Sequence, residues 1–149
     1  MAMQKITLGT VAAIAIVALL ISVLGALMAT QTFTNSATIK TVGIGVYSDA
    51  GFTQKVTSLD WGTLTPGETK AKTLYIRNEG STQISLSMSV GNWTPPSTSD
   101  YITVIWNRQG TILNVGSSTS ATFTLSVSQS ITGITSFTFD ITITGTEHT

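Results

Sequence analysis

The chain has 149 residues, no cysteine and a formal net charge of zero, and only 9% of its residues are charged. The balanced charge argues against a nucleic-acid-binding surface, and the lack of cysteine excludes disulfides, thiolate metal sites and thiol catalysis. Serine and threonine make up nearly a third of the sequence, yet they alternate with Val, Ile, Leu and Phe, which indicates β-structure rather than disorder.

The first expected element is an apolar helix over Ile6–Met28. No charge lies between Lys5 and Lys40. At 1.5 Å per residue the helix would span roughly 34 Å, slightly more than the hydrocarbon core of a bilayer. We therefore expect residues 1–29 to be a signal or transmembrane segment, with the N-terminus cytoplasmic and the rest exported to the cell surface or beyond. Retention as a membrane anchor and cleavage near Ala29 both stay open.

Small residues recur on one face of this segment. Ala18, Ser22 and Ala26 follow one another at four-residue spacing, a pattern that lets helices approach closely in a membrane or a filament core. These three residues are the helix-packing candidates. Ordinary signal-peptide composition would give the same pattern.

Residues 30–37 are predicted to be a polar linker, and residues 38–149 a β-sandwich domain. The first predicted strand is Thr38–Tyr47, in which apolar residues face one way and glycines the other. The apolar positions are Val42, Ile44 and Val46, and the glycines are Gly43 and Gly45.

Further period-two runs follow, separated by Gly, Pro and Asn turns. Thr65-Pro66-Gly67 has the Pro and Gly positions of a type II turn. About seven strands at roughly ten-residue spacing predict an all-β, immunoglobulin-like antiparallel sandwich. The other predicted strands are Gln54–Trp61, Thr69–Arg77, Gln83–Val90, Tyr101–Trp106, Ala121–Val127 and Phe137–Ile143.

The residues that could carry chemistry are few. The single histidine, His148, is next to last, and the seven carboxylates are scattered. We predict no enzyme, and no catalytic, cofactor-binding or metal site, although a loop calcium site near Asp49 and Asp60 stays open. Asn92-Trp93-Thr94 is an acceptor sequon, so Asn92 can carry a glycan in an exported chain.

Two segments resemble a known family. Lys5–Leu20, KITLGTVAAIAIVALL, looks like the leader of the TasA/camelysin family of exported proteins. Leu64–Ser81, LTPGETKAKTLYIRNEGS, is similar to that family's Pro-Gly turn, strand and Asn-x-Gly-Ser turn. Archaeal bundling pilins are built on the same type of domain. This chain is shorter, less charged and without the long loop insertions of TasA.

The resemblance implies a homopolymeric fibre in which the N-terminal segment of one subunit supplies a strand that its neighbour lacks. Val42, Ile44 and Val46 would then fill the neighbour's groove, and Gly43 and Gly45 would allow close backbone approach. An incomplete sandwich has unpaired backbone groups that such a strand satisfies.

Other readings stay open. Residues 38–47 can instead be the first strand of their own sandwich, with a donor strand further upstream, around residues 32–37. The protein can also be a monomeric surface module on a retained anchor, or a pilin that polymerises through its helix.

Overall fold

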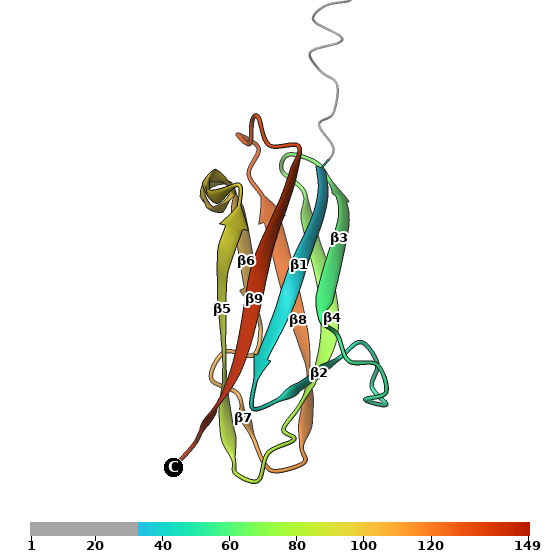
Figure 1. Cartoon of the computed structure of the whole chain (residues 1–149), viewed down its shortest axis with the longest axis vertical. Coiled ribbons are helices and arrows are strands. Elements are labelled where there is room, and N and C mark those ends of the chain that lie inside the picture. Colours follow the sequence, from blue (N-terminus) through green and yellow to red (C-terminus); the bar gives the residue numbers. More distant parts are fainter. Residues whose placement is uncertain (1–32) are drawn as a thin grey trace, which may run out of the picture. The chain divides into compact units, whose positions relative to one another are not determined.

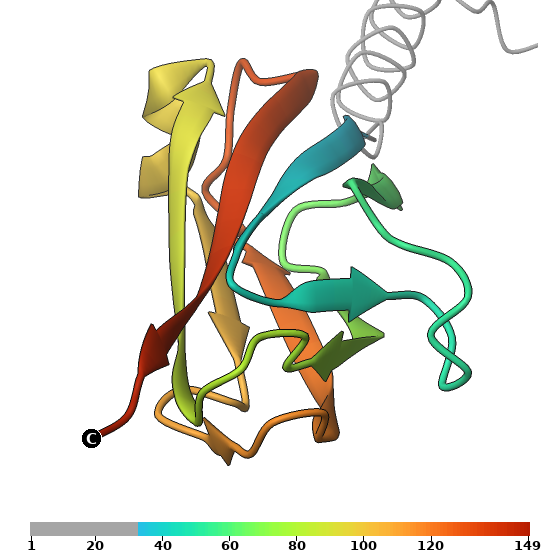
Figure 2. The ribbon, with the colours of Figure 1, turned by 60° about the horizontal axis from the view of Figure 1, so that its bottom comes forward.

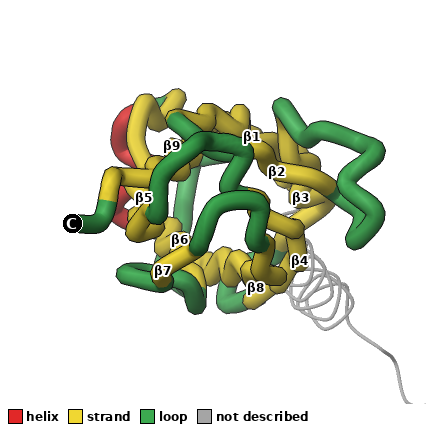
Figure 3. The backbone as a smooth tube through the Cα atoms, turned by 90° about the horizontal axis from the view of Figure 1, so that it is seen from below, coloured by secondary structure: helices red, strands yellow, loops and turns green. Residues whose placement is uncertain are grey.

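The structure of this chain, a computed structural model, describes residues 33–149. They lie within one compact unit, Gln31–Thr149. Nine strands in this part of the chain form two sheets that face each other (Figures 1 and 3). The expected all-β class and two-sheet arrangement are therefore confirmed.

Five strands form the first sheet, in the order β3-β1-β9-β5-β7, and four form the second, in the order β2-β4-β8-β6. Within the described residues every strand pairing is antiparallel except that of β1 with β9. A short 3-10 helix, η1 (Pro96–Asp100), joins β5 to β6. The strands are β1 (Phe33–Val42), β2 (Gly45–Tyr47), β3 (Ser58–Leu64), β4 (Thr69–Arg77), β5 (Ile84–Thr94), β6 (Ile102–Trp106), β7 (Ile112–Leu113), β8 (Ser118–Val127) and β9 (Ser136–Glu147).

The core lies between the two sheets and is built from alternate positions along the strands. Successive side chains of a strand point to opposite faces, so alternating apolar and hydroxyl residues give each sheet one dry face and one polar face. In β9 the apolar residues are buried and the hydroxyl residues between them are more exposed. The largest fully buried side chains include Trp61, Phe123, Phe137 and Phe139.

The prediction of one continuous strand over Thr38–Tyr47 is wrong. The chain breaks at Gly43, whose φ of +72° lies in the left-handed region that favours glycine. β1 ends just before this residue in one sheet, and β2 begins at Gly45 in the other. Figure 2 shows the two strands running in different directions from this bend.

β1 also begins earlier than predicted. Residues 33–37, which were expected to belong to a polar linker, pair with β3, and residues 34–37 also pair with β9. Their inward residues are Asn35 and Ala37, both buried. Neither residue is strongly hydrophobic, so the usual apolar signal of a strand is weak here.

Several local predictions are confirmed. Thr69–Arg77 is β4, with the predicted bounds. The turn before it is type II: Gly67 has a φ of +80°, and the N–H of Glu68 donates to the carbonyl of Thr65 at 3.0 Å.

Candidate functional site

The candidate site is built around β1, which lies inside the five-stranded sheet, between β3 and β9 (Figure 1). Nine residues of β1 pair with β9 in parallel, and six pair with β3 in antiparallel orientation. Among the described strands, β3 pairs only with β1. Because neighbouring strands lie about 4.7–4.9 Å apart, removal of β1 would leave two facing edges separated by a gap one strand wide.

Of the β1 side chains that the structure describes, three point into the core: Asn35, Ala37 and Ile39, which are 2%, 1% and 6% exposed. Ser36 and Thr38, between them, are exposed. β1 therefore alternates as a half-buried strand should, and two of these inward residues, Asn35 and Ala37, are polar or small. The sequence contains a weak signal for this strand, because Ala37 and Ile39 alternate with Ser36 and Thr38. That alternation could have extended the predicted strand toward the N-terminus.

The strand register gives each inward residue of β1 two neighbours. Ala37 lies opposite Leu59 of β3 and Phe139 of β9, so a small side chain separates two large ones. Asn35 lies opposite Gly62 of β3, and its Nδ2 donates to the Gly62 carbonyl at 3.5 Å. The space that β1 fills is therefore uneven in size and polarity.

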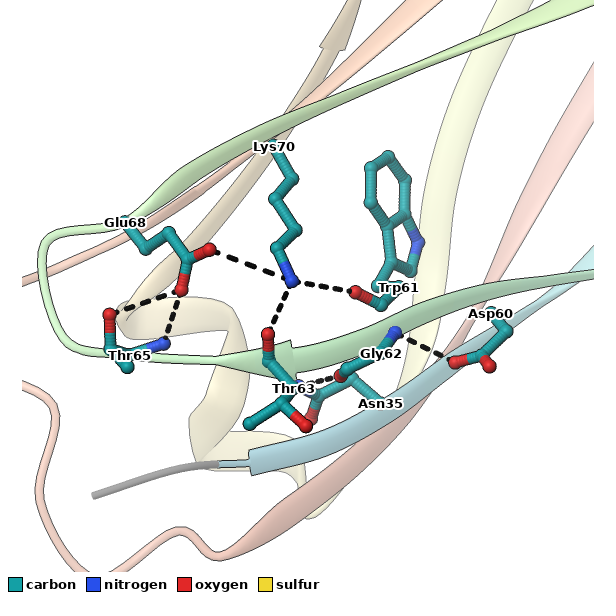
Figure 4. A network of polar contacts seen from close by, with 8 residues as sticks. All are labelled: Asn35, Asp60, Trp61, Gly62, Thr63, Thr65, Glu68 and Lys70. Carbon is teal, nitrogen blue, oxygen red and sulfur yellow. Dashed lines mark hydrogen bonds and ion pairs between the residues drawn. The ribbon is translucent and has the colours of Figure 1, made fainter. Parts of the chain in front are cut away.

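The end of this space near Asn35 is formed by an irregularity in β3, where the register with β1 shifts. Gly62 adopts a φ of +65°, and its N–H donates to Asp60 Oδ1 at 2.7 Å. From β4, Lys70 Nζ donates to the carbonyls of Trp61, at 3.3 Å, and Thr63. Figure 4 shows these contacts, which hold the Gly62 carbonyl where Asn35 meets it.

Lys70 is in turn held by the turn between β3 and β4. Its Nζ lies 3.5 Å from Glu68 Oε1. The other oxygen of this carboxylate accepts from Thr65, at 2.7 Å from the backbone N–H and 3.0 Å from the hydroxyl. The backbone hydrogen bond from Thr65, and then Lys70, hold the pKa of Glu68 below its ordinary value of 4.5.

β2, which follows β1, is firmly attached to the second sheet. All three of its residues are buried. Tyr47 donates its hydroxyl proton to Glu79 Oε1, and Lys55 Nζ lies 3.2 Å from Glu79 Oε2. The Tyr47 hydrogen bond lowers the pKa of Glu79 and raises that of Tyr47. A Cβ on Gly45 would lie 2.6–2.7 Å from the Tyr47 and Glu79 side chains, so a larger residue here would have to displace them.

The predicted donor residues do not lie on one strand. Val42 ends β1, Gly43 and Ile44 form the connection, and Gly45 and Val46 belong to β2. Ile44 and Val46 are buried in the chain's own core. At the connection the backbone passes close to β9: a Cβ on Gly43 would lie 3.3 Å from the Gly145 carbonyl oxygen.

The other predicted positions lie on strands other than β1 or in loops, and Asp60 of β3 lies opposite Ser36. Asn92 is exposed at the end of β5, and its Nδ2 donates to Asp140 Oδ2 at 2.6 Å. Asp49 caps the loop after β2 by accepting from the N–H groups of Thr53 and Gln54. The described residues contain no group of three or more His, Cys, Asp and Glu side chains that could hold a metal ion.

The helix-packing candidates Ala18, Ser22 and Ala26, and the whole predicted apolar helix Ile6–Met28, lie outside the described residues. Within residues 33–149 no helix has the length and apolar character needed to cross a membrane.

Neither a scan against protein-family models nor a search of curated proteins finds a match for this chain.

Proposed function

We propose that this protein is a structural subunit of an extracellular filament, assembled by donor-strand exchange between immunoglobulin-like sandwiches. The strand that moves is β1: it leaves its own sheet and fills the same position in the next subunit. One observation carries the proposal. The first described strand occupies an interior position between β3 and β9 and is joined to the rest of the domain only through the short Gly43–Ile44 connection.

Exchange costs few contacts, because β3 and β9 of the acceptor replace the contacts that β1 loses when it leaves β3 and β9 of its own subunit. The same backbone pairs form with β3 and β9, including the hydrogen bond from the N–H of Ile39 to the carbonyl of Thr57, at 2.9 Å. Strand addition of this kind satisfies the unpaired backbone groups of sheet edges. The anchored β2 keeps the remainder of the donor in place while β1 moves.

Export follows in this proposal from the apolar segment 6–28, and the partners are identical subunits. The second candidate is a monomeric surface module, held at the membrane if that segment is retained. It is favoured by the closed arrangement, in which β1 completes its own sheet.

A cysteine pair across β1 and β3 separates the two candidates. Thr38 and Ser58 are opposed and exposed. Because Ile39 donates to Thr57, the Thr38–Ser58 pair is a non-hydrogen-bonded pair, in which side chains approach most closely. The native chain has no cysteine, so Thr38→Cys/Ser58→Cys is the only thiol pair in the variant. The chain from Gln31 onward, a compact unit, is used.

Oxidation of concentrated, assembled protein should give a ladder of covalent multimers on a denaturing gel, because each disulfide then joins two subunits. Oxidation of dilute protein first should give an intrachain disulfide that locks β1 in place and blocks assembly. The matched control is Thr73→Cys/Thr122→Cys, an opposed pair on β4 and β8. The Thr122 N–H donates to Asn107, so this pair is also non-hydrogen-bonded, and it should give monomers under both conditions. Intrachain disulfides alone in the concentrated Thr38/Ser58 variant would overturn the filament proposal.

A further inference from the structure

We propose that three inward side chains in the described part of β1, Asn35, Ala37 and Ile39, form a recognition code that restricts strand exchange to copies of this chain. The code consists of a polar residue, a small residue and a β-branched residue at alternate positions along the strand. This inference rests on the proposed strand exchange and adds what the groove selects for. Its partner is a second copy of this chain, and its selectivity comes from size and polarity rather than from charge.

The central position of the code is selected by size. Ala37 is 1% exposed and lies between Leu59 and Phe139, both of which are buried. Protein interiors are close-packed, and an added methylene group in such a position forces side chains or backbone to move. A donor strand with a large residue here would meet both side chains at once. The groove therefore accepts a small residue at this position.

The first position is selected by polarity. Asn35 lies opposite Gly62, whose carbonyl accepts from the Asn35 amide. That carbonyl is fixed by the contacts of Asp60 and Lys70 with the irregular part of β3. A buried amide is stable only where it has hydrogen-bond partners. The groove offers such a partner at the Gly62 end.

Together the positions fix the register of the inserted strand. A slip by one residue would turn the exposed Ser36 and Thr38 into the core. A slip by two residues in one direction would place Ile39 between Leu59 and Phe139, where Ala37 fits. The opposite slip would place Asn35 there, away from the Gly62 carbonyl. Each alternative either overfills the groove or buries an amide among apolar side chains.

The test separates donor from acceptor by putting one cysteine on each. A donor chain carries Thr38→Cys, and an acceptor chain of different mass carries Ser58→Cys, so their mixed disulfide reports β1 of one chain in the groove of the other. Every donor also carries Leu59→Ala, so that its own groove accommodates a leucine at position 37 and only the acceptor groove discriminates. The yield of mixed disulfide is compared for donors with and without Ala37→Leu, and for acceptors with and without Leu59→Ala. Ser36→Leu, a similar increase in size on the exposed face of β1, is the matched donor control.

We expect Ala37→Leu in the donor to lower the yield with the unmodified groove at least about tenfold, which corresponds to about 1.4 kcal/mol. Leu59→Ala in the acceptor should restore most of this loss, because it opens the space that the larger side chain needs. Ser36→Leu should leave the yield within about twofold of the parent donor, because its side chain faces solvent.

Equal yields for Ala37→Leu and the parent donor would overturn the code while leaving strand exchange intact. A loss that Leu59→Ala does not restore would also overturn it, because the effect would then not come from size matching. Absence of mixed disulfide between the parent chains would overturn the proposed exchange itself, and the code with it.

Discussion

β1 and β8 occupy comparable places in the two sheets but contribute very differently to the core. Each has ten residues and lies between two other strands. The inward residues of β8 are Ala121, Phe123, Leu125 and Val127, all buried, whereas the described inward residues of β1 are Asn35, Ala37 and Ile39.

The difference lies in what holds each strand. Burial of a Phe or Leu side chain contributes about 1.5–3 kcal/mol, whereas a single methyl group contributes about 0.8 kcal/mol. β8 is therefore held largely by its buried side chains. The described inward residues of β1 bury less apolar surface, so backbone pairing with β3 and β9 makes up a larger share of what holds them. An interior position in a sheet therefore does not by itself show how strongly a strand is held there.

The largest effect on stability should come from truncating a large buried side chain of β8. Phe123 is fully buried and packs 5.7 Å from the Trp106 ring. Phe123→Ala should lower the free energy of unfolding by about 3–5 kcal/mol, measured by urea denaturation. Ala37→Gly on β1 should cost about 1 kcal/mol. Similar losses for the two variants would remove the basis of the comparison.

Hydrogen exchange should show that β1 opens before β8. The N–H of Ile39 in β1 donates to Thr57, and that of Val127 in β8 donates to Glu68. We expect the Ile39 amide to exchange about a hundredfold faster than the Val127 amide, a difference of about 2.7 kcal/mol in opening free energy. Equal rates would mean that both strands are released only by global unfolding.

Gly43 should control the balance between closed and exchanged β1. Its φ of +72° is matched by Gly116, in the turn before β8. Alanine at either position should destabilise the closed monomer by about 1–2 kcal/mol because of the left-handed conformation. Only Gly43→Ala should also increase the multimer fraction in analytical ultracentrifugation, because release of β1 relieves the strain. An equal increase for Gly116→Ala would contradict this role.

The smallest effect concerns pH and should fall on the β1 side. The folded pKa of Glu68 is below 4.5, so its contribution to stability is present above that value and is lost as the pH falls through the folded pKa. In the native protein the Ile39 amide should therefore exchange faster with solvent as the pH falls, beyond the intrinsic pH effect. In Glu68→Gln this increase, measured by hydrogen exchange, should be smaller. The Phe123 amide of β8 should respond equally in the two proteins. An unchanged pH response at Ile39 would show that the turn does not support the groove.

The sequence predicts the strands that are held by large side chains better than it predicts β1. β4 was predicted with its bounds because Leu74 and Ile76 alternate with polar residues and a Pro-Gly turn precedes them. In β1 the inward Asn35 and Ala37 carry little hydrophobic signal. The break at Gly43 was missed because Val42, Ile44 and Val46 continue the alternation across it.

The same property explains why the sequence alone does not point to the inward residues of β1. The family resemblance implies a donor strand in the segment before β3. The residues expected to form it, from Val42 to Val46, are divided between two sheets. The environments of Ala37 and Asn35 are formed by Leu59, Gly62 and Phe139, which are distant in sequence. Local pattern alone carries no information on such pairings.

In a fibre built by the proposed exchange, the parallel pairing of β1 with β9 would set a direction. Every inserted strand must run the same way as the C-terminal strand of its acceptor, so all subunits point toward one end. The two ends then differ chemically: one presents an empty groove between β3 and β9, and the other an uninserted strand. Growth by the proposed exchange would therefore be restricted to head-to-tail addition. A chain that offers the groove but lacks β1 would terminate the fibre from one end only.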